Sequence, residues 1–177
     1  LSHPSPGSSL LHFVLESAME NVTGASTVTI NGVETITVAS NGVTANSVTL
    51  SADRATTVNV NGANSLTLAG MAAATTINAA SMTGGLTAGL AVVGALTGGS
   101  GNDSLTGSSG NDILTGNAGN DTLTAAAGID TMLGGDGNDR IVFATAGDLT
   151  VADSVDGGAG TNTLSVSAAD VETNNDL

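Results

Sequence analysis

Residues 98–106 read GGSGNDSLT, and this nine-residue pattern continues without a gap through residue 142. The copies that follow are GSSGNDILT at 107–115, GNAGNDTLT at 116–124, AAAGIDTML at 125–133 and GGDGNDRIV at 134–142. A sixth, imperfect copy, GGAGTNTLS, occupies residues 157–165. Tandem copies in one fixed register do not arise by chance, so this segment decides the fold.

Each nonapeptide is read as a six-residue turn followed by three extended residues. Glycine allows the positive φ angles that so tight a loop needs, and the apolar residue at position eight points inward from a short strand. Two nonapeptides complete one coil, so loops eighteen residues apart stack on the same edge. One edge then carries Asp103, Asp121 and Asp139, and the opposite edge carries Asp112 and Asp130.

Residues 21–97 alternate apolar and polar side chains and are rich in Thr and Val, which predicts strands. The expected strands are 26–30, 34–38, 47–51, 57–60, 65–68 and 75–78. The expected inward residues are Val28, Ile30, Ile36, Val38, Val48, Leu50, Val58, Val60, Leu66, Leu68, Ile77, Leu86 and Leu96. Their spacing fits an antiparallel sandwich or a parallel solenoid. A large apolar residue recurs every nine residues from Leu96 to Ile141, which favours one continuous solenoid.

The formal charge of −14 is concentrated in the repeats. Residues 1–97 carry four acids and Arg54, whereas residues 98–177 carry twelve acids and Arg140. Carboxylates stacked at the spacing of neighbouring strands, about 4.8 Å, repel by roughly 3–4 kcal/mol at an effective dielectric near 20. Calcium between stacked loops reverses the sign, because it binds carboxylate and backbone carbonyl oxygens. The charge also makes nucleic acid a poor partner.

Residues 98–142 closely resemble the RTX (repeats-in-toxin) β-roll of proteins exported by bacterial type I secretion. The resemblance implies an all-β, right-handed parallel β-solenoid with several Ca²⁺ ions, each between two stacked loops. The position-six carboxylates of both loops would bind each ion: Asp103, Asp112, Asp121, Asp130 and Asp139. Carbonyls of the glycine-rich positions would complete the shell: Gly99, Gly101, Gly107, Gly110, Gly116, Gly119, Gly128, Gly134, Gly135 and Gly137.

Three departures from the pattern qualify this expectation. The loop AAAGID at 125–130 lacks two glycines, so the edge with Asp112 and Asp130 is expected to bind more weakly. The last copy has an amide in place of the carboxylate, which leaves weaker expected ligands: Asn162, Gly158 and Gly160. Three further acids are expected to be solvated: Asp148, Asp153 and Asp156.

The chain divides into four expected segments. Residues 1–20 form a short capping helix or a cloning remnant, and residues 21–97 form metal-free coils. Residues 98–142 form the calcium β-roll, and residues 143–177 form a degenerate repeat and the start of a following module. A weaker resemblance, to bacterial S-layer and large repetitive surface proteins, is carried by GVETITVAS at 32–40 and by residues 139–164.

These features favour a structural module of a secreted bacterial surface or matrix protein that folds on calcium after export. Neighbouring modules or further copies are the expected partners. No apolar run is long enough for a membrane span, and no catalytic motif is present, so we expect no enzyme. One alternative is the secretion appendage of an exported toxin or hydrolase. Another is an ice-binding or adhesin solenoid, which would need a regular outward row of threonines on one face. Asn59 and Asn78 interrupt such a row, and the repeat loops are expected to lack it.

Overall fold

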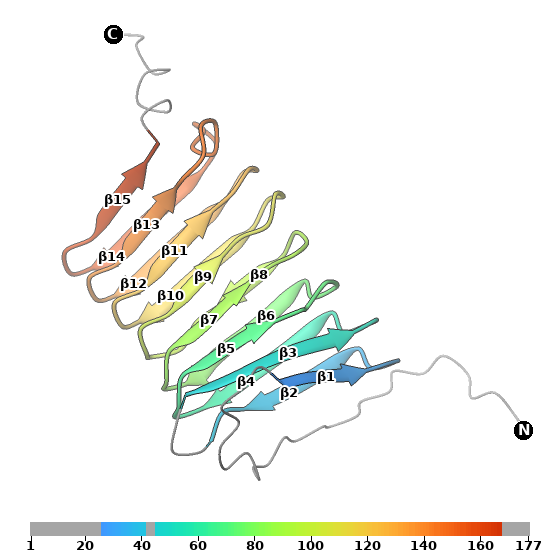
Figure 1. The fold of residues 1–177 in the computed structure, drawn as a ribbon. Coiled ribbons are helices and arrows are strands. Elements are labelled where there is room, and N and C mark those ends of the chain that lie inside the picture. The colour runs from blue at the N-terminus through green and yellow to red at the C-terminus, as the bar shows by residue number, and fades with distance from the viewer. Residues whose placement is uncertain (1–25, 42–44, 168–177) are drawn as a thin grey trace, which may run out of the picture.

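The computed structural model describes residues 26–41 and 45–167, and within these ranges every regular element is a β-strand. Each coil contributes one strand to each of two facing sheets, and the coils stack into a slender rod (Figure 1). The expected N-terminal helix at 1–20 lies outside the described residues. None of the elements in the described ranges is a helix with the length and hydropathy of a membrane span.

Fifteen strands form the described part of the solenoid. The odd-numbered sheet contains β1 (Ser26–Ile30), β3 (Asn46–Ala52), β5 (Leu66–Ala69), β7 (Leu86–Gly89), β9 (Ser104–Thr106), β11 (Thr122–Ala125), β13 (Arg140–Phe143) and β15 (Thr163–Val166). The even-numbered sheet contains β2 (Thr35–Ala39), β4 (Thr57–Gly62), β6 (Thr76–Met82), β8 (Ala95–Thr97), β10 (Ile113–Ala118), β12 (Thr131–Asp136) and β14 (Ser154–Ala159). Neighbouring strands in both sheets pair in parallel, so the solenoid prediction is confirmed and the sandwich is excluded.

The length of a coil changes along the rod. Ser26 pairs with Val48 at the amino-terminal end, twenty-two residues on. In the repeats Leu96 pairs with Leu114, and the interval settles at the predicted eighteen residues. After β13 the interval between paired residues widens to twenty-three, as the hydrogen bond from the N–H of Asp130 to Oδ1 of Asp153 shows. Five extra residues therefore enter the loop between β13 and β14, and they matter for the site described below.

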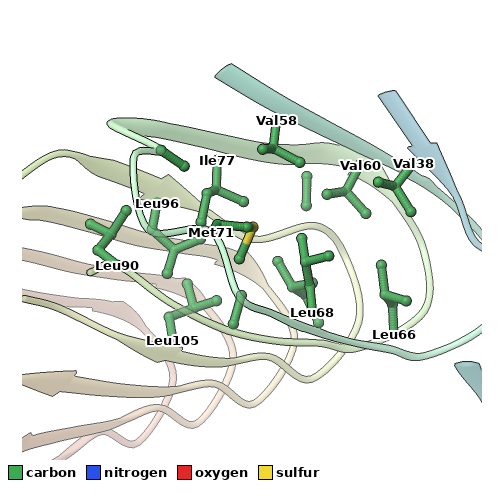
Figure 2. Packing of buried hydrophobic residues seen from close by; sticks show 14 of the residues in the cluster. Val38, Val58, Val60, Leu66, Leu68, Met71, Ile77, Leu90, Leu96 and Leu105 are labelled. Atoms are coloured by element: carbon green, nitrogen blue, oxygen red, sulfur yellow. The ribbon is translucent and has the colours of Figure 1, made fainter. Parts of the chain in front are cut away.

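The core is a single apolar column between the two sheets (Figure 2). All the predicted inward residues are buried except Val28, which is partly buried against the column. Upstream strands insert two apolar side chains each, as Val58 and Val60 do. Strands β8 to β12 insert one large side chain each, from the series Leu96, Leu105, Leu114, Leu123 and Met132, and β13 inserts Ile141 together with Phe143. A buried side chain of this size contributes about 1.5–3 kcal/mol, so the repeat coils have the thinner core.

Strand length in the repeats differs from the prediction on one sheet. Strand β9 has the expected three residues, but β10 and β12 have six. The difference arises because the first loop residues keep their cross-strand partners: Asn117 pairs with Gly135 and Ala118 with Asp136. The glycine-rich loops are therefore stacked in register with one another, and their backbone groups occupy fixed positions.

Candidate metal centre

Aspartates of successive coils form a first ladder in the loops that lead into the odd-numbered sheet. The N–H of Asp103 donates to Oδ1 of Asp121 at 2.7 Å, and the N–H of Asp121 donates to Oδ1 of Asp139 at 2.8 Å. The ladder starts where the N–H of Leu86 donates to Oδ1 of Asp103 and ends where Asp139 donates to Oδ1 of Asn162. The predicted edge of three aspartates exists, with Asn162 in register at its end.

A second ladder runs through the loops that lead into the even-numbered sheet. It begins where the N–H of Gly94 donates to Oδ1 of Asp112 at 2.7 Å. Asp112 donates to Oδ1 of Asp130 at 2.8 Å, and Asp130 donates to Oδ1 of Asp153 at 2.7 Å. The second ladder therefore holds three aspartates, whereas the sequence predicted two.

The expectation that Asp148, Asp153 and Asp156 are all solvated is wrong for two of them. Asp153 is part-buried as the last member of the second ladder. Asp148 is only 7% exposed, and its Oδ2 accepts the N–H of Thr145. Asp156 is exposed as expected. The cause is the five-residue widening of the loop, which shifts the register that a fixed count assumes.

The second carboxylate oxygens separate the ladder aspartates into two kinds. Oδ2 of Asp103 accepts the N–H of Gly99, and Oδ2 of Asp112 accepts the N–H and the hydroxyl of Ser108. Three other Oδ2 atoms are buried without any hydrogen-bond donor: those of Asp121, Asp130 and Asp139. A buried polar atom left unpaired costs about 1–3 kcal/mol, and more when it is charged. These oxygens therefore indicate a ligand.

Backbone carbonyls converge on the same oxygens beside glycines that have no room for a side chain. A Cβ at Gly116 would overlap Oδ2 of Asp121 and the carbonyl oxygen of Gly134. A Cβ at Gly134 would overlap Oδ2 of Asp139 and come within 2.5 Å of the carbonyl oxygen of Gly157. A carboxylate oxygen of one loop and a backbone carbonyl of the next coil thus border the same small space. At Gly116 and Gly134 there is no room for a side chain, so only glycine fits.

The predicted glycine ligands all lie in the loops beside the two ladders. Six of them have positive φ: Gly119, Gly128, Gly135, Gly137, Gly158 and Gly160. The four remaining loop glycines besides Gly116 and Gly134 are Gly99, Gly101, Gly107 and Gly110. Gly98 and Gly157 are not among the predicted ligands, although they occupy position one of their copies, as Gly116 and Gly134 do.

The donor set fits a hard cation. Among residues 26–41 and 45–167, no three His, Cys, Asp or Glu side chains are close enough to hold a metal together. A bound ion would therefore combine ladder carboxylates with loop carbonyls. Calcium takes six to eight oxygen ligands of these two kinds, whereas softer metals prefer nitrogen or sulfur. The orphaned Oδ2 atoms and the carbonyls beside Gly116 and Gly134 suit calcium.

Burial raises the pKa of three ladder carboxylates: those of Asp103, Asp121 and Asp130. Burial, with added repulsion from Asp103 and Asp139, raises the pKa of Asp121 from 3.8 to about 7, although the N–H of Asp103 opposes the rise. Burial also raises the pKa of Asp103, against hydrogen bonds from Leu86 and Gly99. Without calcium the folded chain therefore favours the protonated form of Asp121 at mildly acidic pH.

This shift predicts that the calcium-free solenoid is more stable at pH 5 than at pH 8. Between pH 3.8 and about 7 the folded chain holds a proton on Asp121 that the unfolded chain has released. The contribution is complete below the unfolded pKa and is lost as the pH rises through the folded pKa. Circular dichroism in excess chelator measures it, because the β signal that the repeats retain should be larger at pH 5 than at pH 8. A retained β signal that is equal or larger at pH 8 would contradict the assignment.

Comparison with known proteins identifies the repeat. The family model of the RTX calcium-binding nonapeptide repeat (four copies) matches residues 97–132, 115–148 and 152–168. No curated protein and no solved structure matches the chain. The matched residues contain both ladders, and the coils upstream of residue 97 lie outside the match.

Proposed function

We propose that the chain is a calcium-dependent structural module of a secreted bacterial surface, S-layer or extracellular matrix protein, because the family model of the RTX calcium-binding repeat matches residues 97–148 and 152–168 and these residues lie in a parallel β-solenoid. RTX repeats are characteristic of secreted proteins. The observation that carries the proposal is the set of buried Oδ2 atoms without donors on Asp121, Asp130 and Asp139. Calcium ions between loops eighteen residues apart would bind these oxygens.

The proposed mechanism couples folding to calcium. Each repeat coil buries two large apolar side chains, while one stacked pair of carboxylates repels by about 3–4 kcal/mol at an effective dielectric near 20. At about 1.5–3 kcal/mol per buried leucine, one such pair offsets more than one of the two side chains. At low cytosolic calcium the repeats stay unfolded and exportable. Extracellular calcium modules bind at about 10⁻⁴–10⁻³ M, and the binding energy becomes folding energy.

The first ladder is proposed to bind calcium more tightly than the second. Position one of the loops beside Asp121 and Asp139 is glycine, and both glycines border the oxygens described above. The loop before Asp130 has Ala125 at that position, buried at 3% exposure. A methyl group there narrows the space that glycine leaves open. Two classes of calcium affinity are therefore expected in a calorimetric titration, with the tighter class lost in a Gly116→Ala variant.

Calcium removal tests the proposed function directly. In excess chelator we expect the β signal in circular dichroism to fall, because the repeat coils unfold. Hydrogen exchange should place the loss of protection at β9–β15, while β2–β6, with their thicker core, stay protected. Magnesium at the same concentration is the control, because its rigid octahedral preference suits these loops less well. An unchanged β signal in chelator would refute calcium-coupled folding.

The same geometry leaves room for the secretion-appendage alternative, in which the repeats assist export of an activity encoded elsewhere. Both proposals share the calcium chemistry and differ in what the rod is attached to. Thr-rich coils lie directly upstream of the repeats and continue the same sheets, since β8 pairs with both β6 and β10. This continuity favours a structural rod that associates with neighbouring modules or further copies.

Ice binding is a second candidate that one observation favours. The outer face of the odd-numbered sheet carries hydroxyl side chains in cross-strand register, in the order Ser47, Thr67, Thr87, Ser104 and Thr122. Within the repeats this row consists of Ser104 and Thr122. Asn59 and Asn78 interrupt the other sheet as expected, and Arg140 interrupts this row. A thermal hysteresis measurement distinguishes this candidate from the first.

A further inference from the structure

The second ladder ends on a residue whose loop has none of the repeat glycines. Residues 148–153 read DLTVAD, yet Asp130 donates to Oδ1 of Asp153 at 2.7 Å, close to the 2.8 Å between Asp112 and Asp130. The backbone repeats the geometry as well. Ser154 donates to the carbonyl of Asp130 at 2.9 Å, as Thr131 donates to that of Asp112. Asp153 is therefore equivalent to the aspartates of regular copies.

The wide loop between β13 and β14 decides which acid takes this place. Eighteen residues after Asp130 comes Asp148, where an uninterrupted repeat would continue the ladder. In the structure Met132 pairs with Val155, so the ladder position moves five residues on, to Asp153. Asp148 instead closes its own turn, with its Oδ2 on the N–H of Thr145 at 2.9 Å.

A short turn holds the Asp153 carboxylate as the regular loops hold theirs. Oδ2 of Asp153 accepts the N–H of Thr150 at 2.6 Å and the threonine hydroxyl at 3.0 Å. Oδ2 of Asp112, at the other end of the ladder, accepts the N–H of Ser108 at 2.6 Å and its hydroxyl at 2.8 Å. Both ends of the second ladder are thus fixed in the same way.

Asp130 lies between these two fixed carboxylates and is the unsatisfied member. It is 1% exposed, and its Oδ2 has no hydrogen-bond donor. Burial raises its pKa, and the carboxylates of Asp112, Asp153 and Asp148 add to the rise. A buried, unpaired carboxylate oxygen facing further negative charge is a place where a cation is favoured.

We propose that Asp153 is a calcium ligand that shares one ion with Asp130, so that the five-residue insertion preserves a site that the sequence pattern hides. The inference rests on the proposed calcium-binding function. It assigns the second ladder a site between the loops that end at Asp130 and Asp153, beside the one between Asp112 and Asp130. Asp148 contributes negative charge nearby and is not a ligand.

The substitution Asp153→Asn in the full chain tests the assignment. Asn162 accepts the N–H of Asp139 at 2.7 Å, so an amide is compatible with a ladder position. At saturating calcium, native mass spectrometry should count one calcium ion fewer in D153N than in the unaltered chain. Asp148→Asn and Asp156→Asn remove the same charge and should leave the count unchanged. Asp153→Ser, which also keeps an oxygen for Asp130, is the second variant should D153N fail to fold.

The outcomes separate this assignment from the function on which it rests. A D153N chain with the full number of ions would overturn the role of Asp153 while leaving calcium-dependent folding intact. Loss of an ion in D148N instead would move the ligand to Asp148 and also overturn it. If the unaltered chain binds no calcium at millimolar concentration, the proposed function itself fails, and the assignment fails with it.

Discussion

Replacing Asp121 by Asn is expected to act in opposite directions with and without calcium. In calcium, the concentration needed for half-maximal folding should rise on the order of 10- to 100-fold, because the middle carboxylate of the first ladder is lost as a ligand. In chelator, where the unaltered repeats unfold, the variant should retain more of their β structure on heating. Asp121 lies between Asp103 and Asp139; burial raises its pKa most, and repulsion from these two carboxylates adds to the rise. Removing its charge relieves both contacts.

The amide keeps the rest of the ladder in place, which makes this substitution informative. Oδ1 of residue 121 can still accept the N–H of Asp103, as Oδ1 of Asn162 accepts that of Asp139. Circular dichroism followed during calcium titration, and thermal melts in chelator, measure the two effects. Asp156→Asn is the control, since it removes one exposed charge outside both ladders. If Asp156→Asn shifted the calcium midpoint and the melting behaviour as much as Asp121→Asn does, the effect would come from net charge and not from the ladder.

The regular parts of the molecule could be read from the sequence because two periodicities are local. The alternation of apolar and polar residues predicted that Val58 and Val60 point inward. The nine-residue period predicted that Leu105 and Leu123 lie in the same core, and all four are buried. Parallel pairing followed from the unbroken transition near Leu96. Each of these inferences depends only on neighbours one or two coils away, where the spacing in the sequence equals the spacing in the fold.

The end of the second ladder could not be read in this way. Counting forward from Asp130 by two repeats reaches Asp148, and counting back from Asn162 by one repeat reaches Asp153. Both are aspartates, so composition does not choose between them. The choice depends on where five extra residues are accommodated, and that is decided by the pairing of β12 with β14. Insertions in loops cost little, so the stack continues on either side of them.

The sequence also could not distinguish ladder oxygens that have donors from those that lack them. Asp103 and Asp121 occupy the same position of nearly identical copies. Oδ2 of Asp103 nevertheless accepts the N–H of Gly99, whereas Oδ2 of Asp121 has no donor. In the copy that contains Asp121, the residue at the position of Gly99 is Asn117, with φ of 77°, and its side chain donates to the carbonyl of Gly98. Loop conformation thus separates the two carboxylates.

Gly134→Ala is expected to have the other large effect, by filling the space between a carboxylate and a carbonyl. The new Cβ would overlap Oδ2 of Asp139 and lie 2.5 Å from the carbonyl oxygen of Gly157. The φ angle of Gly134 is not in the left-handed region, so the substitution tests space alone. Since the clashing carbonyl is backbone, we expect the calcium-bound form to lose about 3 kcal/mol or more.

The matched control for Gly134→Ala is Gly89→Ala, on strand β7. A Cβ at Gly89 would meet Cβ and the carbonyl oxygen of Thr106 at 3.5 Å, which is ordinary contact, and its φ is also not left-handed. Its stability should change by less than about 1 kcal/mol. Chemical unfolding in millimolar calcium measures both variants. Because the overlap at Gly134 also removes ligand space, the folded variant should bind one calcium ion fewer than Gly89→Ala at saturating calcium, as counted by native mass spectrometry. A full count together with the same loss of stability would show that Gly134 serves packing of the loops and not the metal.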